Sequence, residues 1–190
     1  MIMSIPEDLL LVVPPRQRRN GGAYLGYGLA GALLAELLLQ NRIVVRGETL
    51  SIFDARSTGD EILDQALANI ARSSRERSVK WWVTELHRSV KRWREPYIER
   101  LQARSTVAAE ELKARLRNAV LLPERLEPRV ATLAGLCEAC RISVVSREEA
   151  KHARQRLRDI VRTHVVAAAV AGAVADTEAV MLAVLPAITG

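Results

Sequence analysis

Apolar side chains recur at helical spacing along most of this sequence, and this periodicity restricts the possible folds more than any other feature. Three apolar runs are preceded by capping-box spacing, a Ser or Thr followed three positions later by Glu: Ser4/Glu7, Thr58/Glu61 and Ser146/Glu149. Aromatic residues make up only 4% of the chain, and much of its apolar content is Leu and Ala, which favour helices. We therefore predict an all-α (mainly helical) fold, a compact multi-helix single domain over residues 1–190.

The individual helices can be placed from their caps, breakers and apolar faces. The predicted helices are a short one through Leu9–Val13 that ends at Pro14–Pro15, then Tyr24–Gln40, Thr58–Ile70, one from Ser78, one with Pro96 in its first turn, Ala108–Leu121, Arg129–Ile142, Glu148–Val174 and Thr177–Leu185. Arg16–Gly22 is predicted to be a basic loop and Arg72–Arg77 a polar link.

Two further local patterns refine this assignment. Ile43–Phe53 has the pattern of a small β-hairpin with a turn at Gly47-Glu48. Gly26, Gly28 and Gly31 are spaced through the first half of the helix predicted over Tyr24–Gln40, which indicates a buried helix that a neighbour approaches closely.

The sequence also restricts where the protein works. Two cysteines are too few for a disulfide framework, and the N-terminus shows no basic region followed by an apolar signal core. The most membrane-like segment, Val165–Ala175, is followed by Asp176 and Glu178, so it falls short of the ~20 apolar residues of a spanning helix. We expect a cytoplasmic protein whose contact with a membrane, if it has one, is peripheral.

The formal net charge is +6, and all of it is contributed by one stretch. Between Arg72 and Arg104 there are ten Lys or Arg and four Glu, and all three tryptophans lie in this stretch. A basic surface of this kind favours anionic partners, either an acidic membrane or nucleic acid. A solvated helix face that covers core tryptophans is the alternative interpretation.

Helical spacing divides this stretch into two faces. The predicted core face comprises Val79, Trp82, Val83, Leu86, Val90 and Trp93. A second stripe comprises Lys80, His87, Lys91 and Arg94, with Trp81 exposed beside it. Cations next to an exposed indole would suit a lipid headgroup layer or a phosphate backbone.

The first third of the chain carries a specific resemblance. The run Thr58-Gly-Asp-x-x-Leu-Asp-x-Ala-Leu67, together with Gly28–Leu37 and Asn41-Arg-Ile43, resembles the Golgi phosphoprotein 3 family, in a short form similar to its bacterial members. The resemblance implies a helical peripheral membrane protein that binds phosphatidylinositol 4-phosphate. In eukaryotes the family also holds membrane enzymes in the Golgi, so the resemblance implies a possible membrane-enzyme partner.

The resemblance also indicates which residues would contact the headgroup. Two family arginines, three positions apart on a helix, correspond to Lys91 and Arg94, while a third corresponds to Ala30 and the pocket tryptophan to Gly21. Arg16, Arg18 and Arg19, just before Gly21, are candidate substitute cations. The family's long hairpin is replaced by a direct connection over Ser105–Glu110.

Other reactive side chains are more simply interpreted as structural. Cys137 and Cys140 lie inside a predicted helix and have no second pair to complete a zinc site. His152 and His164 are too far apart on one predicted helix to bind one metal.

Asp60 and Asp64 fit a helix start and a polar helix face. No phosphate loop or nucleophile motif is found in the sequence. We expect neither a metal site nor a cofactor, and a binding protein rather than an enzyme.

Three functions therefore follow as hypotheses. The first is binding of anionic lipid headgroups through Lys91, Arg94, Arg16, Arg18 and Arg19. The second is nucleic-acid binding by the same basic stretch, which we consider less favoured because no recognition motif accompanies it. The third is an adaptor that recruits a membrane-bound enzyme.

Overall fold

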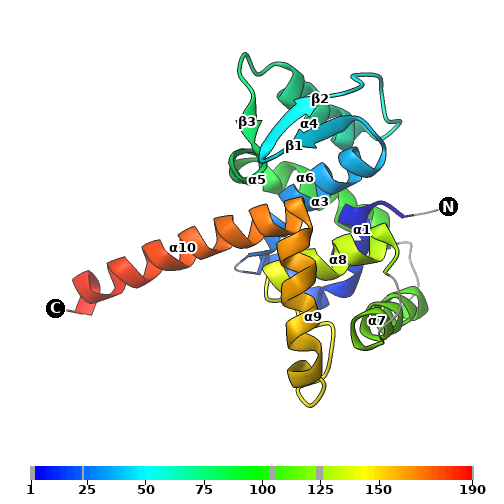
Figure 1. Cartoon of the computed structure of the whole chain (residues 1–190), viewed down its shortest axis with the longest axis vertical. Helices are drawn as coiled ribbons and strands as arrows, with labels where there is room; N and C mark the ends of the chain where they lie inside the picture. Colours follow the sequence, from blue (N-terminus) through cyan, green and yellow to red (C-terminus); the bar gives the residue numbers. More distant parts are fainter. Residues whose placement is uncertain (1–2, 23, 103–105, 123–125, 190) are drawn as a thin grey trace.

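The computed structural model describes residues 3–22, 24–102, 106–122 and 126–189, with side chains at 19, 20, 102, 106 and 183–189 left outside the description. The elements are α1 (Ile5–Val12), α2 (Pro15–Asn20), α3 (Leu25–Leu39), β1 (Ile43–Arg46), β2 (Thr49–Ile52), α4 (Glu61–Ala71), β3 (Arg77–Ser78), α5 (Val79–Arg88), α6 (Val90–Gln102), α7 (Thr106–Leu121), α8 (Pro128–Ala139), α9 (Ala150–Thr163) and α10 (Val165–Thr189). The predicted mainly helical fold is confirmed. Figure 1 shows the small sheet and α4 at one end of the molecule, α7 and α9 at the other, and α10 leaving the body sideways.

Helix α3 is the centre of the core, because α1, α5, α8 and α10 all pack against it. Its glycines allow these close approaches. A Cβ at Gly28 would lie 2.6 Å from Cys140 Sγ, and a Cβ at Gly31 would overlap Val170 Cγ2 of α10. The prediction of a buried helix with near neighbours is confirmed.

A buried ion cluster joins three of these helices. Arg129 on α8 places Nη2 3.2 Å from Asp8 Oδ2 on α1 and Nη1 3.3 Å from Glu36 Oε2 on α3. Glu36 Oε2 also accepts a hydrogen bond from the backbone N–H of Ile5 at 2.7 Å. Burial raises the pKa of Asp8 to about 6, although Arg129 acts in the opposite direction.

The predicted hairpin is confirmed, with Ile43 paired to Ile52 and Arg46 to Thr49 across a turn where Gly47 has a φ of 61°. The predicted polar link over Arg72–Arg77 was wrong at its end. Its last residue begins β3, which pairs with β2. Two residues are too few to show the alternation that marks a strand in a sequence.

Helix starts were misplaced where local patterns compete. Arg16–Gly22 is not a loop, because Pro15 opens α2 and Gly21, with a φ of 68°, ends it. Asp60, rather than Thr58, caps α4. Pro96 does not open a helix: α6 begins at Val90, directly after the break at Ser89, and Pro96 lies in its interior.

The last two predicted helices are divided differently in the structure. The helix predicted over Glu148–Val174 breaks at His164, whose backbone is extended, and the predicted Thr177–Leu185 helix is part of α10. The hydrogen bonds of the Ser146/Glu149 capping box are present, at 3.0 and 3.3 Å. Because α10 continues past Asp176, it is the one described helix whose length and composition would allow a membrane crossing, over Val165–Leu182.

Candidate anion-binding site

The tryptophans of the basic stretch lie as predicted. Trp82 and Trp93 are buried in the core, whereas Trp81 is 38% exposed. The Arg77 guanidinium lies over the Trp81 ring, 5.0 Å from its centroid. The predicted core face is confirmed apart from Val90, which is only partly buried.

The predicted cation stripe does not form a continuous row. Lys80 turns toward α10 and pairs with Asp176 at 2.7 Å. His87 stacks on Tyr27 with ring centroids 3.9 Å apart. Burial lowers the pKa of His87, which disfavours the charged form of its ring. Because these contacts engage Lys80 and His87, only Lys91 and Arg94, beyond the break at Ser89, remain from this stripe.

Lys91 and Arg94 differ in their surroundings. Lys91 is exposed and has no ion-pair partner among the described residues. Arg94 is partly buried, and its Nη1 occupies the space that a Cβ at Gly21 would need, with Cζ 3.4 Å from that position. The Arg94 guanidinium of α6 therefore lies against Gly21, the residue that caps the end of α2, far away in sequence.

The end of α2 gives this contact an electrostatic reason. The last carbonyls of a helix lack internal N–H partners and carry partial negative charge, so a nearby cation is favoured. However, Arg94 Nε is buried and has no hydrogen-bond partner among the described residues. A buried donor without a partner costs free energy, so this guanidinium is held at a fixed position with one nitrogen unsatisfied.

The three arginines of α2 have different positions. Arg16 is exposed at the start of the helix. Arg18 turns inward and donates from Nε to the Val13 carbonyl at 2.7 Å and from Nη2 to the Leu11 carbonyl at 2.9 Å. It therefore caps the end of α1, and burial lowers its pKa. The Arg19 side chain lies outside the described residues.

The two departures from the family's headgroup positions have clear structural consequences. Ala30 is fully buried on α3, so no cation can occupy that position without disrupting the core. At Gly21, Arg94 fills the space a larger side chain would need. The structure thus brings Arg94 to the α2 segment but does not assemble the four family positions.

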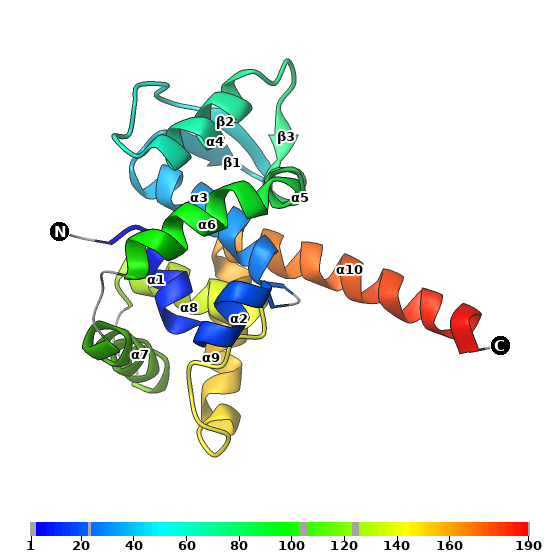
Figure 2. The same ribbon diagram turned by 180° about the vertical axis from the view of Figure 1, so that it is seen from behind.

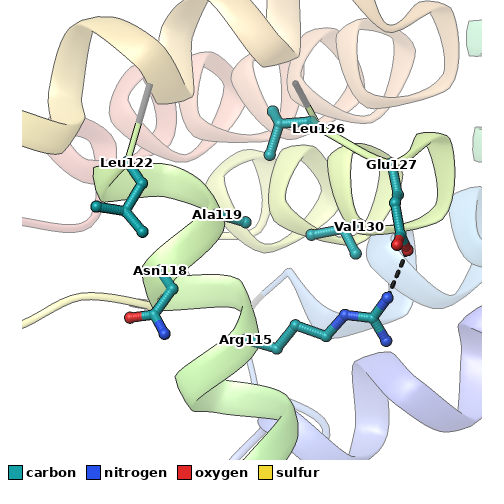
Figure 3. A pocket seen from close by; sticks show the side chains of 7 residues that line it. All are labelled: Arg115, Asn118, Ala119, Leu122, Leu126, Glu127 and Val130. Carbon is teal, nitrogen blue, oxygen red and sulfur yellow. Dashed lines mark hydrogen bonds and ion pairs between the residues drawn. The ribbon is translucent and has the colours of Figure 1, made fainter. Parts of the chain in front are cut away.

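A hollow of about 450 Å³ lies elsewhere, at the end of α7 and the start of α8. Figure 3 shows its lining, with an ion pair between Arg115 and Glu127 on one side. The other lining residues are Asn118, Ala119, Leu122, Leu126 and Val130. Sequence reasoning missed this hollow, because the two helix ends that form it carry no reactive pattern. Among its described lining residues the one cation, Arg115, is already paired, which makes the hollow a poor anion site.

The motif that carries the family resemblance stabilises the fold. Asp60 Oδ1 accepts hydrogen bonds from the N–H groups of Ile62 at 2.8 Å and Leu63 at 3.3 Å. Its Oδ2 pairs with Arg100 Nη1 on α6 at 2.5 Å. Asp64 is more than a surface residue, since it accepts a hydrogen bond from the Thr58 N–H at 2.6 Å.

The remaining reactive groups have structural surroundings. Cys137 and Cys140 are buried free thiols, as interpreted from the sequence, and burial raises the pKa of Cys140 to about 12. His152 is exposed. His164, at the junction of α9 and α10, places its Nε2 2.7 Å from Thr132 Oγ1. The described residues contain no group of three potential metal ligands from His, Cys, Asp and Glu.

Comparison with known proteins places this arrangement in a family. The family model described as Golgi phosphoprotein 3 matches residues 5–111 and 99–177, which together run from α1 into α10. No curated protein matches the chain. Because the two matched segments cover most of the sequence, the chain belongs to the Golgi phosphoprotein 3 family.

Proposed function

We propose that this protein binds anionic lipid headgroups at the cytoplasmic surface of a membrane, through Lys91, Arg94 and the α2 segment. The observation that carries the proposal is the position of Arg94, whose guanidinium lies against Gly21 with a buried Nε that has no partner among the described residues. Family membership supports the same function. The activity proposed is binding rather than catalysis, and recruitment of a membrane enzyme would depend on it.

The proposed contact has two parts with different strengths. Arg94 provides directed donors at a fixed position, while Lys91 and Arg16 are exposed and act mainly as charges. Near an acidic membrane each basic residue contributes about 1 kcal/mol, so these three together supply roughly 3 kcal/mol. Because exposed charges are screened by salt, this part of the binding should weaken strongly between about 0.05 and 0.5 M salt, as the Debye length falls from ~14 Å to ~4 Å.

Arg18 is better assigned to the fold than to the ligand. Two of its guanidinium nitrogens are engaged by carbonyls at the end of α1. Withdrawing them would leave these carbonyls without their partners. We therefore place Lys91, Arg94 and Arg16 at the centre of the proposed surface.

The test is sedimentation with vesicles of neutral phosphatidylcholine, with and without phosphatidylserine or phosphatidylinositol 4-phosphate. Lys91→Gln/Arg94→Gln should weaken binding to anionic vesicles by roughly 30-fold, as two contacts of about 1 kcal/mol predict. Lys151→Gln/Arg154→Gln is the matched control, because it removes the same charge at the same spacing from exposed positions on α9. It should have a much smaller effect.

Two results would refute the proposal: equal recovery with neutral and anionic vesicles, or equal losses from the two double variants. Since Arg94 also contacts α2, its replacement could disturb folding. Lys91→Glu/Arg16→Glu changes only exposed residues and keeps the test valid. Competition by duplex DNA or RNA at the same salt decides between a membrane and a nucleic acid, because a nucleic-acid protein would prefer the competitor.

A further inference from the structure

The distal part of α10 projects from the body and carries no charge. Figures 1 and 2, seen from opposite sides, both show this part of the helix extending away from every other element. From Ala179 to Thr189 the sequence has only apolar residues and one threonine. Soluble proteins rarely leave an apolar segment of this kind exposed to water, so we expect another apolar surface to cover it.

The exposed side chains surround the helix instead of forming one stripe. Val180, Met181 and Leu182 are consecutive, and they are 63%, 53% and 68% exposed. Successive residues of a helix point about 100° apart, so these three cover more than half of its circumference. A second helix would cover a single stripe and leave the rest in water, whereas a hydrocarbon layer covers all sides.

The proximal part of α10 cannot take part in the same contact. Val166, Val170 and Val174 are at most 1% exposed and pack in the core. A crossing by Val165–Leu182 would therefore require the core to open. The eleven residues from Ala179 to Thr189 span about 16 Å, roughly half of the ~30 Å hydrocarbon thickness. This length fits insertion into one leaflet.

The base of the projecting segment is suited to a headgroup layer. Its two acidic residues are paired, Asp176 with Lys80 at 2.7 Å and Glu178 with Arg141 at 3.5 Å. Thr177 Oγ1 donates to Tyr27 Oη at 3.0 Å. The contact with Tyr27 places the base beside the first turn of α3, which follows the α2 segment against which Arg94 packs.

From these observations we infer that residues 179–189 of α10 insert into one leaflet of an anionic membrane, while the cations at Lys91, Arg94 and Arg16 contact its headgroups. The inference rests on the proposed headgroup binding, because the charges bring α10 to the surface and orient it. Two weak signals, one electrostatic and one apolar, together give stable attachment where either alone would be marginal.

The experiment compares two variants in phosphatidylserine-containing vesicles at 0.1 and 1 M salt. Met181→Gln/Leu182→Gln removes apolar contact without changing charge. Phe53→Gln/Leu122→Gln is its matched control, since these residues are 70% and 47% exposed on the body. At 1 M salt the electrostatic part is screened, because the Debye length is ~3 Å.

At 1 M salt the wild-type protein should keep a weaker, salt-resistant part of its binding, which Met181→Gln/Leu182→Gln reduces at least tenfold and the control variant does not. Unchanged binding of Met181→Gln/Leu182→Gln at both salt concentrations would overturn the insertion. So would a lipid-free dimer of the wild type, seen by sedimentation equilibrium, that this variant converts to a monomer, because the helix would then be covered by a second copy.

The two proposals fail separately. If Lys91→Gln/Arg94→Gln has no effect while Met181→Gln/Leu182→Gln releases the protein, headgroup binding is wrong and insertion stands. If only the salt-sensitive part exists, and only Lys91→Gln/Arg94→Gln reduces it, headgroup binding stands and insertion is wrong.

Discussion

Replacing Asp60 with alanine should destabilise the fold through two separable contacts. Its Oδ1 caps α4 by accepting from the N–H groups of Ile62 and Leu63, and its Oδ2 pairs with Arg100 of α6. The carboxylate is 20% exposed and the Arg100 side chain 39%. This single side chain therefore links the motif that marks the family to the helix that carries Lys91 and Arg94.

The magnitude follows from the two contacts. Loss of an N-cap acceptor lowers the free energy of unfolding by about 1 kcal/mol. The ion pair is partly solvated, so its loss adds only about 0.5–1 kcal/mol. The total of ~2 kcal/mol should lower the melting temperature by about 4–8 °C in a chain of this length. Asp60→Asn keeps an oxygen acceptor, so it should lose only the ion-pair part.

Thermal and urea unfolding followed by circular dichroism would measure these differences. Glu61→Ala is the control, because it removes a negative charge from the same helix turn without removing a cap. Asp60→Asn should have almost no further effect in an Arg100→Gln background, since the pair is already lost. The reasoning fails if Asp60→Asn is as harmful as Asp60→Ala, or if Glu61→Ala matches either.

Two further predictions concern the core. Gly31→Ala should lower the free energy of unfolding, measured by urea unfolding, by about 1–2 kcal/mol. Overpacking against Val170 should outweigh the gain in helix propensity, and an unchanged free energy of unfolding would contradict the close approach. The folded-state pKa of Asp8 is about 6, above its ordinary 3.8, so its stabilising contribution is complete at low pH and is lost as the pH rises through 6. Asp8→Asn cannot ionise at this position, so it should not lose stability in this way. From pH 4 to pH 7 its free energy of unfolding should improve relative to that of the wild type by up to ~3 kcal/mol. Urea unfolding measures both free energies, and profiles against pH that run parallel for the two proteins would contradict this prediction.

The sequence could predict several residues of the candidate site, but it could not predict which of them lie together in space. Spacing and resemblance identified Lys91, which is exposed on α6, and Arg94, which is partly buried against Gly21. The same reasoning grouped them with Lys80 and His87, which instead contact Asp176 and Tyr27. Partners of this kind lie on α3 and α10, beyond the reach of any pattern within one helix.

The sequence alone determined most of the helices and the hairpin, because these depend on interactions within a few residues along the chain: capping oxygens, apolar spacing and a glycine turn. The glycines at 28 and 31 also indicated that a neighbour approaches α3 closely, but the neighbours themselves, Cys140 and Val170, lie far away in sequence. Only the tertiary structure decided the breaks at Ser89 and His164, the inward turn of Arg18 and the contact of Arg94 with Gly21. The same holds for α10, whose apolar residues look alike in the sequence. Packing against α3, α5 and α8 buries its first half and leaves Val180, Met181 and Leu182 exposed. Burial is a property of which surfaces meet, and that is settled by the whole chain.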